Sequence, residues 1–159
     1  MDAKTGKMWD IVEGSHVCMV IDEFTGGLRA RPMAYFPERE AGAIWFVTAK
    51  DSGKVEEIEQ NPEICMSIRD GSDYASVTGD AIVMQDMAKL KELWNPQIDA
   101  WFPGGPEGGR AVLMRLTPRM GEYWDTPGGI VASVKMLVAS VRDVPPDPGE
   151  NEKVGFGTS

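Results

Sequence analysis

The pattern of apolar and polar positions divides the chain into short β-strands and a few amphipathic helices. The clearest unit starts with a run of apolar and β-branched residues, Ile44–Thr48, which predicts a buried strand. A turn follows, and then a short helix with Val55 and Ile58 on one face and polar residues on the other. Asn61-Pro62 ends this helix, because the residue before a proline is pushed out of the helical region.

The remaining pattern predicts an α+β fold that is mainly β. Further strands are expected at His16–Glu23, Leu28–Phe36, Glu63–Arg69, Tyr74–Gln85 and Arg110–Pro118, the last continuing through Met120–Asp125. Further helices are expected at 2–13, from a cap at Asp86 to Trp94, and at Ile130–Val141. About six strands with short turns indicate a small antiparallel barrel or sandwich with peripheral helices. We expect one domain over residues 1–142, followed by a Pro-, Gly- and Glu-rich tail over 143–159 that is disordered.

Glycine and proline mark the irregular points of these strands. Thr25-Gly26-Gly27 predicts a hairpin turn, and Gly79 predicts a bulge. Pro32 cannot donate a hydrogen bond to a ladder, so its strand is expected at a sheet edge or a bulge. The segment Asn95–Pro106 is rich in Pro and Gly but carries Trp and Phe, and it predicts a loop that packs on something or meets a ligand or partner.

Charge and cysteine content exclude several classes of function. The formal net charge is −9 with a pI near 4.6, which argues against nucleic acid as a partner. Cys18 and Cys65 lie in apolar, strand-like runs, and His16 is the single histidine, so a metal site is not expected. The sequence shows no secretory signal and no apolar run long enough to cross a membrane, which predicts a cytoplasmic protein.

Two positions carry candidate anion-binding chemistry. The turn before the short helix contains Ser52 and Lys54, and a helix N-terminus, a hydroxyl and an ammonium can together hold a phosphate. The alternative is that Asp51 or Ser52 caps the helix and the lysine is solvated; the spacing is not that of a P-loop. Arg29 and Arg31 share one face of their strand, so they are either both solvated or share an anion.

Four segments, taken in order, resemble the flavin-binding split-barrel proteins related to pyridoxamine 5′-phosphate oxidase, and specifically their general stress protein branch. They are Arg31-Pro32-Met33, Phe46–Lys54 running on to Asn61-Pro62, Ile98–Trp101 with the following Phe-Pro-Gly-Gly-Pro, and Glu122-Tyr123-Trp124. The resemblance covers the chain up to its last helix.

This resemblance implies a six-stranded antiparallel split β-barrel that forms a homodimer with two FMN molecules at the dimer interface. By position, Arg31, Ser52 and Lys54 would hold the FMN phosphate. The backbone around Arg31, Pro32 and Met33 and around Val47, Thr48 and Ala49 would line the flavin ring. Trp101 and Trp124 would approach the flavin, at least one of them from the partner chain. The alternative for Arg31 is an ion pair with a carboxylate such as Glu38 or Glu40.

Departures from the family pattern limit the activity that the resemblance implies. The oxidase has a substrate-phosphate lysine where this chain has Phe36, and no arginine stands in the Leu93–Pro96 region. We therefore expect an FMN-dependent oxidoreductase acting on a small substrate other than pyridoxamine phosphate, with no catalytic residue assigned. The alternatives are a flavin-binding stress protein without turnover and a deazaflavin-binding relative. Haem is disfavoured, because no histidine or cysteine is placed as an axial ligand.

Overall fold

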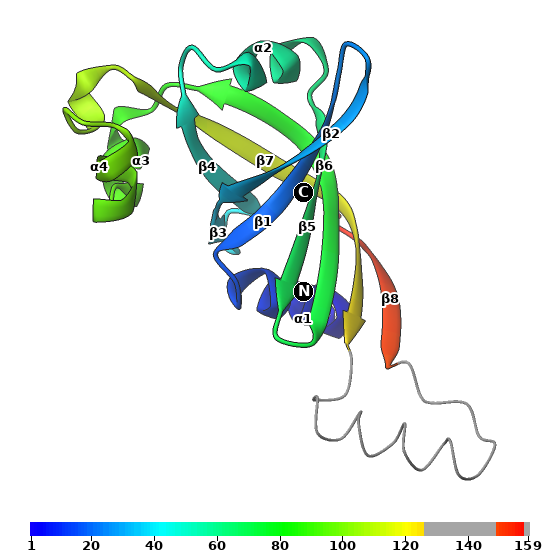
Figure 1. The fold of residues 1–159 in the computed structure, drawn as a ribbon. Helices are drawn as coiled ribbons and strands as arrows, with labels where there is room; N and C mark the ends of the chain where they lie inside the picture. The colour runs from blue at the N-terminus through cyan, green and yellow to red at the C-terminus, as the bar shows by residue number, and fades with distance from the viewer. Residues whose placement is uncertain (126–148, 158–159) are drawn as a thin grey trace, which may run out of the picture.

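The computed structural model describes residues 1–125 and 149–157, in which eight strands form one antiparallel sheet with the order β2-β1-β5-β6-β7-β4-β3, β8 pairing with β7 (Figure 1). The strands are β1 (Val17–Phe24), β2 (Gly27–Ala34), β3 (Phe36–Glu38), β4 (Ala43–Ala49), β5 (Glu63–Asp70), β6 (Asp73–Met84), β7 (Ala111–Asp125) and β8 (Glu150–Gly155). The helices are α1 (Ala3–Glu13), α2 (Gly53–Gln60), α3 (Met87–Leu93), α4 (Pro96–Trp101) and the 3-10 turn η1 (Pro106–Gly108). The predicted α+β split barrel is confirmed.

The sheet curls into a barrel that is open along one line. β2 pairs only with β1, and β4 pairs with β7 along Ile44–Ala49 but with β3 only up to Trp45. The edges Pro32–Ala34 of β2 and Val47–Ala49 of β4 therefore have no ladder partner on their free sides. We call the gap between these two edges the split. Pro32 lies on the edge strand, as the missing N–H of proline requires.

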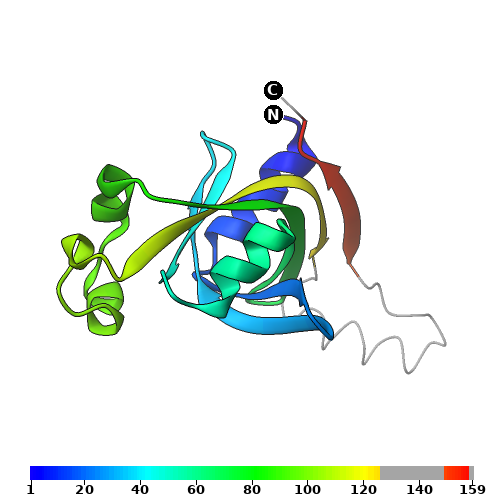
Figure 2. The same ribbon diagram turned by 90° about the horizontal axis from the view of Figure 1, so that it is seen from above.

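The helices lie at distinct places around the barrel. α1 lies near one end and α2 near the other, beside the β1–β2 hairpin, while α3 and α4 stand out to one side (Figures 1 and 2). Asp2 caps α1 by accepting a hydrogen bond from Thr5 N at 2.7 Å, and Tyr35 Oη donates to Val12 O at 2.7 Å, which ties α1 to the sheet. The main hydrophobic core, which includes Phe46, fills the interior of the barrel.

The expected bulge at Gly79 is confirmed. The register between β6 and β7 shifts between Thr78 and Gly79, which leaves Arg119 of β7 without an opposite residue. A Cβ at position 79 would lie 2.0 Å from the carbonyl oxygen of Thr117. Glycine is therefore required here by the close approach of the β7 backbone.

Three sequence predictions differ from the structure. Part of the expected loop is the helix α4, because the Asn95 side chain accepts from Ile98 N at 2.9 Å and Pro96 occupies the first turn, where its missing N–H costs nothing. The sequence pattern predicts a turn from Pro37 to Gly42, but this segment begins within the short strand β3. The strand predicted over Leu28–Phe36 ends at Ala34.

The predicted disorder of the tail is wrong for β8. Its sequence, rich in Glu and Gly, is typical of disorder, but β8 pairs with the otherwise free edge of β7 from Met120 to Asp125. Val154 is buried, and the Phe156 ring packs edge-on against Trp9 with 6.0 Å between centroids. The helix predicted at Ile130–Val141 lies outside the described residues. Among the residues described, no helix has the length and apolar character needed to cross a bilayer.

We predict that Gly79→Ala destabilises the protein by about 1–3 kcal/mol, because the new methyl group forces the β7 backbone away. The matched control is Gly6→Ala in α1, where a Cβ would meet no atom within 4 Å. Gly6→Ala should stabilise the protein by about 0.5–1 kcal/mol, because alanine has a higher helix propensity than glycine. Urea unfolding measures both, and equal effects of the two substitutions would contradict the close approach at Gly79.

Candidate functional site

A cavity of about 520 Å³ fills the split, and we call it the split cavity. Its walls come from both edges of the split, the start of α2 and the α4 region. The lining residues are Val17, Pro32, Met33, Ala34, Phe36, Val47, Thr48, Ala49, Ser52, Lys54, Asn95, Gln97, Ile98, Trp101 and Phe102. Its volume lies within the range of roughly 300–1,000 Å³ that is usual for small-molecule sites.

The two strand edges give this cavity polar backbone groups. Along an antiparallel strand, successive residues direct their N–H and C=O groups to alternate sides, so an unpaired edge presents donors and acceptors to whatever lies beside it. Pro32–Ala34 and Val47–Ala49 form the two edges. A flat heterocycle with a polar rim could hydrogen-bond to them while its faces contact apolar side chains such as Met33 and Val47.

Lys54 is a half-buried cation without a carboxylate partner. Among the described residues it forms no ion pair, and its Nζ lies 3.9 Å from Met33 Sδ. Burial, followed by the positive charge of Arg31, lowers the pKa of Lys54 below its ordinary value. An unpaired cation at the wall of a cavity favours the binding of an anion there.

Ser52 is the N-cap residue of α2, but its side chain makes no cap hydrogen bond. Its Oγ is buried and has no partner among the described residues. The alternative that Asp51 or Ser52 caps the helix therefore holds only for the position of Ser52, not for a capping hydrogen bond from its side chain. A buried hydroxyl without a partner is costly unless a ligand or water satisfies it. Ser52, Lys54 and the free N–H groups of the first turn of α2 together make a set of anion donors.

Arg31 differs from its predicted role, since it does not line the split cavity. Its Nη2 donates to Asp22 Oδ2 at 2.7 Å and also to Glu57 Oε2. Arg29 reaches the other oxygen of Glu57 at 2.6 Å. The two arginines thus share an anion, as one sequence alternative held, and that anion is the Glu57 carboxylate on α2. The alternative that Arg31 forms an ion pair with a carboxylate is confirmed, but the partners are Asp22 and Glu57 and not Glu38 or Glu40.

The α4 region supplies the most exposed wall of the cavity. Trp101 is 79% exposed although it lines the cavity, and Ile98 and Phe102 lie beside it. Trp94 donates from Nε1 to Asp99 at 3.1 Å and packs against the Phe102 ring, which stabilises the short helix. An exposed indole at a cavity rim offers a flat surface on which an aromatic ligand can stack.

Trp124 does not line the split cavity of its own chain. It lies near the end of β7, opposite Tyr74 of β6 and Asn151 of β8. Strand register puts it on the outward face of the sheet, in a group of large apolar side chains that are 37–58% exposed. These residues are Val17, Met19, Tyr74, Met120 and Trp124.

Sequence reasoning missed several lining residues. Asn95 and Gln97 had no assigned role at the site, although Asn95-Pro96 is a recognisable helix start that fixes where these two polar side chains lie. Asp22 and Glu57 were also missed as partners of the arginines. Nothing in their local sequence indicates this pairing, which depends on how α2 lies against β1 and β2.

Comparison with known families identifies the chain. Residues 3–147 match the model of the family described as "Pyridoxamine 5'-phosphate oxidase like". The chain belongs to this family. This match covers almost all of the chain, including both edges of the split and α2.

Relatives of the chain include proteins with solved structures. A candidate general stress protein 26 from Jannaschia sp. CCS1 is 31% identical, with a TM-score of 0.81 over 98% of this chain and 100% of that chain. The general stress FMN/FAD binding protein of Xanthomonas citri is 27% identical, with a TM-score of 0.66 over 76% of this chain and 87% of that one. Protein bli-3 of Neurospora crassa is 30% identical over 134 residues, which are 77% of this chain, and the match spans 61% of the bli-3 length.

The lowered pKa of Lys54 predicts a pH-dependent stability. Between the folded pKa and the ordinary value of 10.5, the unfolded chain binds a proton that the folded chain does not, so stability rises with pH in this window. Lys54→Met should therefore be more stable than the native protein at neutral pH, and this advantage should shrink as the pH approaches 10.5. Urea unfolding at several pH values tests this, with the exposed Lys50→Met as the control. A constant difference between native and Lys54→Met proteins would contradict it.

Proposed function

We propose that this chain is an FMN-binding flavoprotein, with the flavin ring in the split cavity and the phosphate at Ser52 and Lys54. The observation that carries the proposal lies at the start of α2, where a cation and a buried hydroxyl, both without partners among the described residues, stand together on the wall of a mainly apolar cavity. The name of the Xanthomonas citri relative, which is described as binding FMN or FAD, also supports it.

The residues of the split cavity fit such a ligand. The phosphate of FMN would receive hydrogen bonds from Ser52 Oγ, Lys54 Nζ and the first N–H groups of α2. The polar rim of the ring would meet the strand edges Pro32–Ala34 and Val47–Ala49, and its apolar faces would contact side chains such as Met33 and Trp101. Arg31 would act at longer range, since it already holds two carboxylates.

Bound FMN would supply the redox chemistry, and the protein would supply binding and orientation. Lys54 is the one titratable side chain among the described residues that line the cavity. A flavin-dependent oxidoreductase of this kind would use water or the flavin itself for proton transfer, with NADH or NADPH as a donor. The same observation supports a second candidate function, a flavin-binding protein without turnover. Measured turnover with these donors above that of free FMN separates the two.

Pyridoxamine phosphate is not the proposed substrate. A phosphorylated substrate beside FMN would need a second group of cationic side chains in the cavity. Phe36, where the oxidase has a lysine, lies in the cavity wall, and no second cation is present in the described lining. We therefore propose a small substrate without a phosphate group.

We also propose that two copies of the chain associate through the outward face of the sheet. The split cavity continues into this face, because Val17, Pro32 and Ala34 line the cavity and share the outward side of β1 and β2. The apolar side chains of this face need cover from water. A second copy would also bring the part of its outward face that carries Trp124 toward the cavity. This arrangement is consistent with the dimer that the family resemblance implies.

The phosphate site is tested by titrating FMN into the native protein and into Lys54→Ala, with flavin fluorescence as the signal. A hydrogen bond to a charged group contributes about 1.5–3 kcal/mol, so Lys54→Ala should weaken FMN binding by about 10- to 100-fold. Lys50→Ala, which changes an exposed lysine outside the split cavity, is the control and should bind as the native protein does. A native protein that retains no FMN on desalting would refute the proposal.

Association is tested by light scattering after size exclusion. The native chain, of 17.4 kDa, should elute with twice this mass. Met19→Glu puts a charge on the outward face and should give monomers that bind FMN more weakly. Met87→Glu, which replaces an equally exposed methionine on α3, should leave the mass unchanged. A monomeric native protein with full FMN affinity would argue against the shared site.

A further inference from the structure

Glu57 holds both arginines of β2 at the edge of the proposed phosphate site. Its Oε1 accepts from Arg29 Nη2 at 2.6 Å, and its Oε2 accepts from Arg31 Nη2. Arg31 also binds Asp22, whose side chain is only 1% exposed and lies on the inner side of β1. The network therefore joins β1, β2 and α2 at one end of the barrel.

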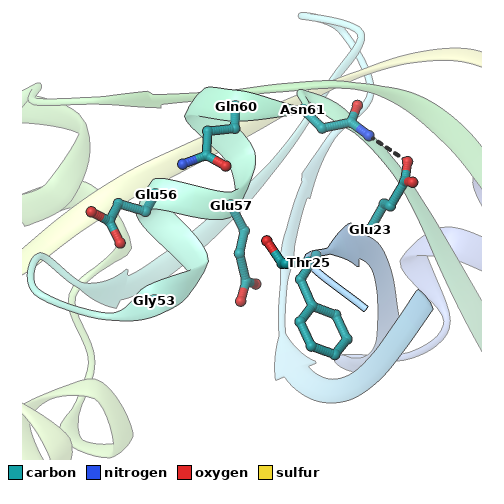
Figure 3. Close-up of a pocket in the computed structure, with 8 residues that line it drawn as sticks. Glu23, Thr25, Gly53, Glu56, Glu57, Gln60 and Asn61 are labelled. Carbon is teal, nitrogen blue, oxygen red and sulfur yellow. Dashed lines mark hydrogen bonds between the residues drawn. The ribbon is translucent and has the colours of Figure 1, made fainter. Parts of the chain in front are cut away.

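The carboxylate of Glu57 lies beside the first turn of its own helix. A Cβ built on Gly53 would lie 3.8 Å from Glu57 Oε1, so the side chain points back toward the N-terminus of α2. Figure 3 shows Glu57 extending below the helix, whereas Glu56 points away from it into the open. The positive end of α2 thus already has a negative charge of its own one turn from Ser52 and Lys54.

A second cavity, shown in Figure 3, adjoins Glu57 but gives its carboxylate no further cationic partner among the described lining residues. It is about 560 Å³ in volume and lies between the tip of the β1–β2 hairpin and α2. Its described lining has three carboxylates, those of Glu23, Glu56 and Glu57, and no cationic side chain. Asn61 donates to Glu23 there at 2.9 Å, and the ion pairs that Glu57 forms with described residues are those with Arg29 and Arg31.

A charge count shows what this carboxylate does to the site. Arg29, Arg31 and Lys54 are positive, and Asp22 and Glu57 are negative, so the cluster keeps one net positive charge. Partial burial alone would raise the pKa of Glu57, but the hydrogen bond from Arg31 lowers it below the ordinary value, so the carboxylate is charged at neutral pH. A phosphate monoester carries up to about two negative charges. The site is therefore about one positive charge short of neutralising it.

We infer that Glu57 is an internal counter-anion that weakens phosphate binding at α2 and so determines how strongly the site prefers phosphorylated over unphosphorylated flavin. The inference rests on the proposed flavin function. Glu57 competes for Arg31, and its charge repels a dianion held by Ser52 and Lys54. Asp22 is not equivalent, because its burial behind Arg31 keeps that ion pair in place whether or not the phosphate is bound.

The test compares FMN with riboflavin, which has the same ring and no phosphate. Glu57→Gln removes the charge but keeps the size and hydrogen-bonding capacity of the side chain. It should bind FMN about tenfold more tightly than the native protein and riboflavin equally well, and its FMN affinity should fall more steeply with salt. Glu59→Gln, an exposed position on the same helix with the same change in net charge, should change neither affinity by more than about twofold.

A second variant keeps the inference falsifiable if Glu57→Gln alters the fold. Arg29→Gln frees Glu57 from one partner without removing its charge, and it should weaken FMN binding severalfold while leaving riboflavin unchanged. Equal shifts for FMN and riboflavin, or no gain for FMN in Glu57→Gln, would overturn the role of Glu57 and leave the proposed flavin site intact. If neither native protein nor Glu57→Gln binds FMN, both proposals fail. If only Glu57→Gln binds it, the proposed function of the native chain fails, although the effect of the internal anion is then observed directly.

Discussion

The incomplete closure of the barrel is the constraint on which the site depends. The free edges at Pro32–Ala34 and Val47–Ala49 face each other without forming a ladder. Proline removes one donor from the first edge, and side chains from both edges and from α2 and α4 fill the rim. Unpaired backbone groups in a partly apolar cavity are costly unless water or a ligand satisfies them. The open line of the barrel is thus a place where a flat, polar-edged ligand gains hydrogen bonds that the protein does not make with itself.

The distribution of charge around α2 decides which ligand suits this place. The chain is acidic overall, with a net charge of −9, so only local cations can hold an anion. Arg29 and Arg31 are largely neutralised by carboxylates, whereas Lys54 is not. The lysine therefore provides the available positive charge, and the arginines adjust its strength through Glu57. This division explains why two arginines on one strand and one lysine on a helix have different roles although all three lie close together.

Local sequence was sufficient for the parts of the structure that depend on neighbours in the chain. The unit from β4 to α2, the cap at Asp86 and the bulge at Gly79 follow from strand pattern, cap chemistry and the conformational freedom of glycine. Most of the residues expected around the flavin do line one cavity. The exceptions are Arg31 and Trp124, and β8 was also missed. These three depend on contacts between distant segments: α2 against β2, a sheet face against whatever covers it, and the tail against the free edge of β7.

The contrast between locally specified segments and segments fixed by distant contacts also bears on which parts of the cavity would bind the cofactor and which the substrate. The side of the cavity that would bind the phosphate and ring edge of FMN is built from elements that local sequence specifies well, namely β4 and the start of α2. Another part of the wall comes from Phe36, on the strand that pairs with β4, and from the α4 region, where exposed Trp101 stands beside apolar and amide side chains. This wall carries no charge among its described residues, so it would select a substrate by shape and stacking rather than by ion pairing. Because Trp101 of the same region would also contact the proposed flavin ring, changes in the α4 region would alter the choice of substrate together with the stacking of the flavin, while the phosphate contacts of Ser52 and Lys54 stay the same.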